Sequence, residues 1–240
     1  RGETSHYYIS IDAVTGATNQ VAVSKAGGWN VFLTADNKLY DTLYDPADKK
    51  YKLVEYDPVT QSITKLGEVP GTVTTSMKIS DDNILYGAVS PTGELFSYNR
   101  NTKVFKNHGK LLPGESWTQY PYLAIDDKGW VYVSFAFEKE RVVGFNPASA
   151  TKTIFHSLDR KTETPVIWRG ANGRVYCVPN PGDSPWNEFH GGIITTLPNS
   201  PPTISLGSNY TPGPLKWSDG TYFQNVRASN KTLEVVDPVG

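Results

Sequence analysis

The chain lacks several features that would assign it to a class at once. Its 240 residues include one cysteine, Cys177, so no intrachain disulfide can form and cysteine usage does not indicate a compartment. No apolar run reaches the ~18 residues that a membrane-spanning helix needs. The formal net charge is -1, from 23 basic and 24 acidic side chains, so the sequence has no overall basic field that would attract nucleic acid.

Catalytic and cofactor motifs of fixed spacing are also missing. The sequence has no Gly-Lys-Ser/Thr phosphate loop, no Gly-x-Ser-x-Gly nucleophile elbow and no dinucleotide-binding fingerprint, so we expect no cofactor. The histidines are not spaced as metal ligands, and we expect no metal site; they are His6, His108, His156 and His190.

An aromatic residue recurs at regular intervals instead. The series is separated by 46, 46, 44 and 47 residues, and it consists of Tyr40, Tyr86, Tyr132, Tyr176 and Phe223. A period in the mid-forties is the length of one four-stranded propeller blade. Short apolar runs bounded by Gly, Asp, Asn and Pro, without helical spacing, predict an all-β fold. We therefore predict a β-propeller with blades of about 45 residues.

A second repeated phrase lies about half a blade away from the first. It opens with Asp or Asn and ends in Thr, Ser or Gly, and its opening residues are Asp12, Asp57, Asn99, Asn146 and Asp237. Such phrases form turns. We place them between the third and fourth strands, c and d, with a degenerate copy at 196–200. The aromatic series then belongs to the hairpin between strands a and b, where Asp126 and Asp127 are interpreted as turn formers.

Both markers together define the blade boundaries. We predict complete blades at 29–69, 72–112, 117–158 and 163–207, with partial blades at 6–24 and 214–240. The first partial blade supplies strands c and d, and the last supplies strands a, b and c. Either the ring closes with about five blades and one surplus strand, or residues 1–240 are a fragment of a larger propeller. The ending at the Asp237 turn favours the fragment.

The longest predicted b–c loop, 179–192, is the most informative stretch for function. In a propeller the b–c and d–a loops share the face that usually carries the ligand site. If the segment is extended, Trp186, Glu188 and His190 point the same way. We predict proton transfer by His190, a general acid/base or orienting role for Glu188, and sugar stacking on Trp186. The alternative is a rigid loop whose Trp packs on the next blade.

Other loops add candidates to the same face. An Arg that binds a carboxylate, beside a Tyr or His that moves a proton, suits a uronic-acid sugar. We therefore predict Tyr120 as a second catalytic residue and Arg160 as the carboxylate clamp, with further substrate contacts from Trp29, Trp117 and Asp183. The alternative is that these aromatics seal the core between blades.

The clearest repeat, 122–132 (Tyr-Leu-Ala-Ile-Asp-Asp-Lys-Gly-Trp-Val-Tyr) with 144–149 (Gly-Phe-Asn-Pro-Ala-Ser), resembles the broad NHL, streptogramin-lyase and quinoprotein-like propellers. It departs from the WD40 type, because no Trp-Asp pair closes a strand c. It also departs from the sialidase type, whose Ser-x-Asp-x-Gly-x-Thr-Trp motif is only approximated by Ser-Asp-Gly-Thr-Tyr at 218–222. The resemblance implies a propeller like those of bacterial extracellular lyases, hydrolases, sensors and binding modules.

Two functions follow as hypotheses. The first is the propeller of a secreted or periplasmic polysaccharide-active protein, either a uronate lyase or a glycoside hydrolase. The second is a non-catalytic scaffold or sensor that binds a glycan or a protein. Whether the chain is an enzyme stays open. The expected partner is a carbohydrate, with remaining blades or a catalytic domain on the same or another polypeptide; no nucleic acid and no membrane span are expected.

Overall fold

The computed structural model describes residues 6–12, 14–24, 31–115, 121–136, 139–159, 164–178, 186–197, 222–225 and 233–236. These residues form twenty β-strands. They contain no helix long and apolar enough to cross a membrane. The strands pair into four four-stranded sheets and two two-stranded sheets, all antiparallel.

We call the four-stranded sheets blades I to IV and their strands a to d in chain order. Blade I consists of β3 (Phe32–Leu33), β4 (Leu39–Asp45), β5 (Lys50–Asp57) and β6 (Ser62–Glu68). Blade II consists of β7 (Val73–Ile79), β8 (Ile84–Ser90), β9 (Glu94–Asn99) and β10 (Val104–Lys110). Blade III consists of β11 (Tyr122–Ile125), β12 (Val131–Phe135), β13 (Glu140–Asn146) and β14 (Thr151–Leu158). Blade IV consists of β15 (Val166–Arg169), β16 (Val175–Val178), β17 (Trp186–His190) and β18 (Ile193–Leu197). The two-stranded sheets are β1 (His6–Ile11) with β2 (Thr18–Ser24), and β19 (Tyr222–Asn225) with β20 (Leu233–Val236).

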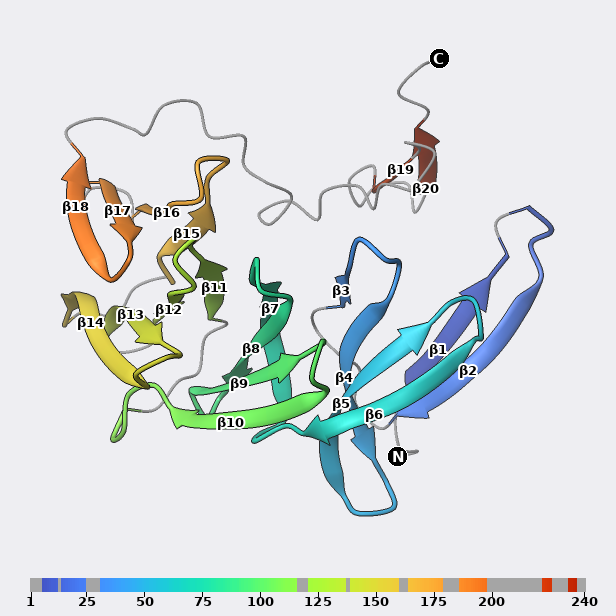
Figure 1. Cartoon of the computed structure of the whole chain (residues 1–240). Coiled ribbons are helices and arrows are strands. Elements are labelled where there is room, and N and C mark those ends of the chain that lie inside the picture. The colour runs from blue at the N-terminus through green and yellow to red at the C-terminus, as the bar shows by residue number, and fades with distance from the viewer. Residues whose placement is uncertain are drawn as a thin grey trace.

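Within each blade, the strands are neighbours in the order in which the chain runs. The blades stand side by side, with strand a of each blade on the inner side and strand d on the outer side (Figure 1). Strand β11 contacts both β7 and β15, so the inner strands of successive blades adjoin one another. This radial repetition of small meander sheets is the propeller architecture that the sequence predicts.

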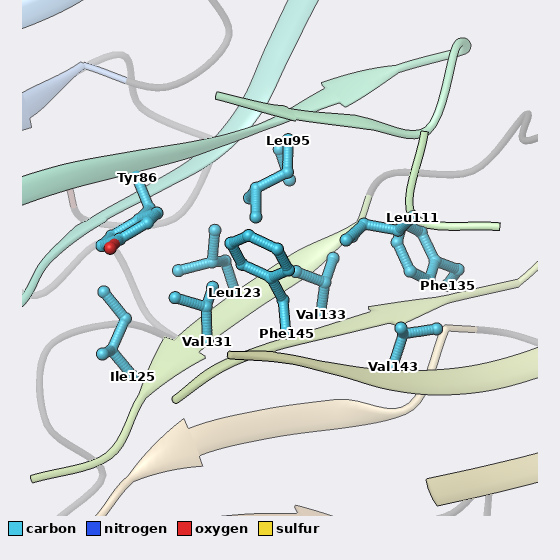
Figure 2. Close-up of a cluster of buried hydrophobic side chains, with 11 residues drawn as sticks. Tyr86, Leu95, Leu111, Leu123, Ile125, Val131, Val133, Phe135, Val143 and Phe145 are labelled. Atoms are coloured by element: carbon cyan, nitrogen blue, oxygen red, sulfur yellow. The ribbon is translucent and has the colours of Figure 1, made fainter. Parts of the chain in front are cut away.

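The regularly spaced tyrosines form the packing between blades. Tyr40 and Tyr132 lie on strand b and are fully buried. The Tyr40 ring lies 6.4 Å from that of Tyr98 in blade II, and the Tyr132 ring lies 5.3 Å from that of Phe189 in blade IV. The residues that meet between blades II and III are shown in Figure 2: Tyr86, Leu95, Leu111, Leu123, Ile125, Val131, Val133, Phe135, Val143 and Phe145. At each of the three described interfaces, between blades I and II, II and III, and III and IV, one tyrosine of the series is therefore buried.

The second repeated phrase forms the c–d turns, as predicted in blades I to III. Oδ1 of Asp57 accepts hydrogen bonds from the backbone N–H groups of Val59 and Thr60. The Asn99 side chain accepts two equivalent bonds in blade II. Short Asp and Asn side chains are favoured here because they reach the backbone two and three residues on.

The c–d turn of blade IV is an exception. The structure places it at Gly191 and Gly192 rather than at 196–200, so that prediction is wrong. The two glycines have φ of 59° and 78°, a pair of left-handed conformations that glycine adopts without steric cost in a two-residue hairpin.

The two-stranded sheets match parts of a blade in register. Phe223, the fifth member of the aromatic series, pairs with Val235, just as Tyr132 pairs with Gly144 between strands b and c of blade III. This register fits the predicted b–c pair, which stays a prediction.

Strands β1 and β2 are a c–d pair. A β-bulge interrupts them between Tyr8 and Ile9, at the position of the bulge between Val142 and Val143 in blade III. The two partial blades at 6–24 and 214–240 stay predictions.

Candidate functional site

Each blade has two ends with different connections. Because the strands are antiparallel, the a–b and c–d turns lie at one end, which we call the turn end. The b–c and d–a connections lie at the other, which we call the loop end. Every turn end of blades I to IV is within the described residues, whereas several loop-end connections lie outside them.

The segment predicted as the longest b–c loop contains a strand. Residues 186–190 are β17, so only 179–185 connect strands b and c of blade IV, and these lie outside the described residues. The prediction of a loop through 192 is wrong, because Phe189 is fully buried and its backbone pairs with strands on both sides. His190 consequently lies at the turn end.

Two of the predicted site residues on β17 face the same side of the sheet. The Trp186 ring meets the Trp168 ring edge-on at 5.8 Å. The Glu188 carboxylate is nearly buried and forms an ion pair with Arg174 on the same blade. Both contacts stabilise blade IV itself.

His190, the third predicted residue on β17, reaches across to blade III. Its Nε2 lies 2.7 Å from Oδ1 of Asp127. The hydrogen bond with His190 holds the pKa of Asp127 below its ordinary value. An imidazole held by a carboxylate can serve proton transfer, but here the pair also links the turn ends of two blades.

The remaining predicted site residues lie outside the described residues: Trp29, Trp117, Tyr120, Asp183 and Arg160. Their roles stay predictions. One distance bears on the prediction that His190 and Tyr120 act together. Pro121 leads into β11 at the loop end, whereas His190 lies at the turn end. At about 3.3 Å per residue, the four-residue strand sets these two ends roughly 10 Å or more apart.

Ionisable side chains gather at the loop end of blade III. Arg141, near the start of β13, is almost fully buried; its Nη2 donates to Asp159 at 2.8 Å and lies 3.5 Å from a Glu115 oxygen. Its Nη1 donates to the backbone carbonyl of Glu140 at 3.0 Å. The hydrogen bond from Arg141 lowers the pKa of Asp159, so this largely exposed carboxylate is charged at neutral pH.

The Glu140 side chain completes this group, which we call the loop-end cluster: Glu115, Glu140, Arg141, His156 and Asp159. Glu140 is fully buried, and its Oε1 lies 2.9 Å from Nε2 of His156. Cys177 lies close enough for the Glu140 charge to act on it, and burial together with that charge raises the pKa of its thiol. Cys177 is therefore a buried core residue rather than a nucleophile.

Sequence reasoning missed Glu140 and Arg141. The available signal was local: two charged residues open a strand that otherwise continues Val-Val-Gly-Phe. Their partners Glu115 and Asp159 are 26 and 18 residues from Arg141 and meet it only in the folded blade.

The cluster has the chemistry of a polar binding site. It holds three carboxylates and one guanidinium, so its formal charge is -2 with His156 neutral, and -1 when Lys139, whose charge acts on Asp159, is included. Fixed carboxylate oxygens accept hydrogen bonds from sugar hydroxyls, whereas a ligand carboxylate is repelled. No group of three or more His, Cys, Asp or Glu side chains within the described ranges is arranged to hold a metal ion.

The fold assigns the chain to the β-propellers. Among solved structures it is similar to streptogramin B lyase, with a TM-score of 0.53 and 14% identity over 91% of this chain and 65% of that chain. At this identity the likeness shows the fold, and it confirms at that level the predicted resemblance to the streptogramin-lyase type.

Other solved structures are similar over shorter parts of their length. A structural-genomics protein from Bacteroides thetaiotaomicron VPI-5482 has a TM-score of 0.49 and 16% identity over 75% of this chain and 50% of that chain. The extracellular domain assigned to a hybrid two-component system of B. thetaiotaomicron has a TM-score of 0.47 and 14% identity over 80% of this chain and 25% of that chain. The chain thus spans less than two thirds of each of these proteins. No protein-family model and no curated protein matches it.

Proposed function

We propose that the protein is a non-catalytic glycan-binding propeller that holds its ligand at the loop end of blades III and IV. The observation that carries this proposal is the loop-end cluster, in which a buried guanidinium orients a largely exposed carboxylate. Arg141 is almost fully buried, while Asp159, its partner at 2.8 Å, is 72% exposed. A carboxylate fixed in this way is pre-organised to accept hydrogen bonds, which lowers the entropy cost of binding.

Chain positions support the same end of the molecule. Trp117 follows Glu115 by two residues, and Arg160 directly follows Asp159. Flat aromatic side chains beside fixed polar groups are the usual components of a sugar site. Trp117 therefore belongs to the proposal as a further ligand contact, whereas the carboxylate clamp predicted for Arg160 belongs to the uronate-lyase hypothesis.

Binding is favoured over the uronate-lyase hypothesis for two reasons. His190 and Glu188 take part in contacts within and between blades, with Asp127 and Arg174 as partners. The cluster is also acidic, which favours a neutral glycan over a uronate. A secreted or periplasmic location is part of the proposal.

A panel of neutral and uronate-containing polysaccharides tests the proposal by affinity electrophoresis and by the absorbance of unsaturated uronic products. We expect retention on a neutral glycan without product formation. The Asp159→Ala variant should weaken retention at least about tenfold, which corresponds to about 1.4 kcal/mol.

Asp81→Ala is the matched control. Asp81 is also an exposed carboxylate bonded to an arginine, Arg169, but it lies at the turn end. Its substitution should leave retention unchanged. Release of unsaturated products that stops in His190→Ala would instead establish the lyase.

A further inference from the structure

The outermost strand of blade IV differs in composition from the other outer strands. Strand β18 reads Ile-Ile-Thr-Thr-Leu and carries no charge. The outer strands of blades I to III, which are β6, β10 and β14, each carry at least one lysine. Lysine on an outer strand opposes pairing with another chain. Strand β18 lacks this protection, and its isoleucine and threonine residues favour strand pairing.

Strand β18 is also regular where the other outer strands are not. β-Bulges interrupt the pairing of strands c and d in blades I, II and III. The pairing of β17 with β18 runs without a register shift, from His190 opposite Ile193 to Trp186 opposite Leu197. A bulge twists an outer edge and disrupts pairing along it. The edge of β18 therefore offers a regular template for a further strand.

The open edge of β18 lies beside exposed apolar side chains. Among the described strands, β18 pairs with β17 alone, and Figure 1 shows it (orange) as the outermost strand of blade IV. Ile193 and Ile194 are 68% and 39% exposed. As successive residues of a strand they lie on opposite faces of the sheet. A strand added at this edge would therefore cover apolar surface on both faces.

We propose that β18 pairs with β18 of a second copy of this chain, antiparallel and centred on Thr195. The two four-stranded sheets of blade IV then form one eight-stranded sheet. The Thr195 residues of the two copies face each other, and Ile194 of each copy lies opposite Thr196 of the other. Such threonine and β-branched pairs stabilise antiparallel sheets. The contact is isologous, since both copies contribute the same strand.

The charge pattern selects a second copy as the occupant. The same self-pairing in β6 would place Lys65, its central residue, opposite a like charge. In β10 and β14 the bulge breaks the register. Strand β18 has no charge to attract an acidic or a basic peptide, whereas its own sequence matches it without any charge conflict.

Sedimentation equilibrium of the full chain over a concentration series tests this contact. Five residues from each copy bury less than the ~1,200 Å² of a standard interface, so we expect a reversible dimer that accumulates as the concentration approaches about 1 mM. Thr195→Lys should weaken the dimer at least about tenfold, because two ammonium groups then face each other. Thr64→Lys is the matched control, since Thr64 is also exposed on an outer strand, β6. It should leave the association unchanged.

Single cysteines test the register of the pairing. On mild oxidation, Thr195→Cys should form a disulfide between two molecules, because directly opposed residues have Cα atoms within ~5.5 Å. Thr196→Cys should do so at least about tenfold less, since the two copies of position 196 are two residues out of register and exceed the ~7 Å limit. The parent protein, whose one cysteine is the buried Cys177, should form none.

Three results would overturn the proposal. The first is a protein that stays monomeric up to about 1 mM. The second is a dimer that Thr195→Lys leaves intact, which would assign the contact to another surface. The third is a disulfide yield from Thr196→Cys that equals or exceeds the yield from Thr195→Cys.

Discussion

The two ends of the blades use charged and polar groups differently. At the turn end these groups connect one blade to another: Arg100 donates to the Tyr40 hydroxyl at 2.8 Å, and the Gly192 N–H donates to the Tyr132 hydroxyl at 3.0 Å. At the loop end of blade III they converge on one buried arginine and leave Asp159 in solvent. Polar groups at the turn end thus link neighbouring blades, whereas at the loop end of blade III the Asp159 carboxylate stays exposed.

Two buried aspartates differ in how fully they are hydrogen-bonded. Asp126 at the turn end accepts four hydrogen bonds, from the N–H groups of Lys128, Trp130 and Gly191 and from the Tyr132 hydroxyl. Its predicted role as a turn former is confirmed. Asp41 in β4 accepts one hydrogen bond from the Thr42 N–H, and its second oxygen has no partner. A satisfied carboxylate supports packing, whereas an unsatisfied one weakens it.

The largest expected effect is at the interface that Tyr132 fills. Tyr132→Ala should lower the free energy of unfolding by about 3–5 kcal/mol, because it removes a fully buried ring that stacks on Phe189. Tyr132→Phe should cost about 1 kcal/mol, the value of the hydroxyl hydrogen bonds alone. Urea denaturation measures both, and similar losses in the two variants would contradict packing as the main role.

Arg141 comes next. Arg141→Met should cost about 2 kcal/mol, below the 3–5 kcal/mol of a fully buried pair, because Asp159 is exposed and rehydrates. The matched turn-end variant is Arg169→Met, whose guanidinium is less buried than that of Arg141 and whose partner Asp81 is also exposed. Its midpoint in urea should move less than that of Arg141→Met. The reverse order would show that the loop-end cluster does not order blade III.

The buried carboxyl group of Asp41 should make the stability of the protein depend on pH. Burial raises the pKa of its carboxyl to about 7. The folded state therefore holds this proton more tightly than the unfolded state, and stability falls as pH rises from about 4 to about 7. Asp41→Asn should remove this fall and be more stable than the parent protein above pH 7. Thermal unfolding at a series of pH values measures the difference; parallel profiles would show that the carboxyl finds a partner.

The smallest effect is expected for His190. The depressed pKa of Asp127 implies a contribution that is present above the ordinary aspartate pKa and is lost as pH falls through the folded value. Both side chains are partly exposed. His190→Ala should therefore shift the Tm at neutral pH less than the substitutions of Tyr132, Arg141 and Asp41 do. A large loss would mean that the turn end depends on this pair more than on its buried rings.

Most of the fold could be predicted because its signals are local in the sequence. Most of the candidate site could not, because its residues are distant in the sequence and meet only in the folded protein. Tyr40, Tyr86 and Tyr132 recur because each described interface between blades buries one such ring, and the Asp57 phrase recurs because its side chain bonds to the backbone of its own turn. The segment 186–192 was misassigned because Gly191 and Gly192 read as loop residues, although they form a hairpin turn. Arg141 was missed because its partners come from other strands and connections.

Hydrogen–deuterium exchange with and without a bound neutral glycan compares the two ends of the blades directly. A ligand site at the loop end predicts slower exchange at 111–115 and 155–159, with no change in the turns at 80–84 and 126–130. Protection confined to those turns, together with unchanged exchange around Arg141 and Asp159, would contradict it.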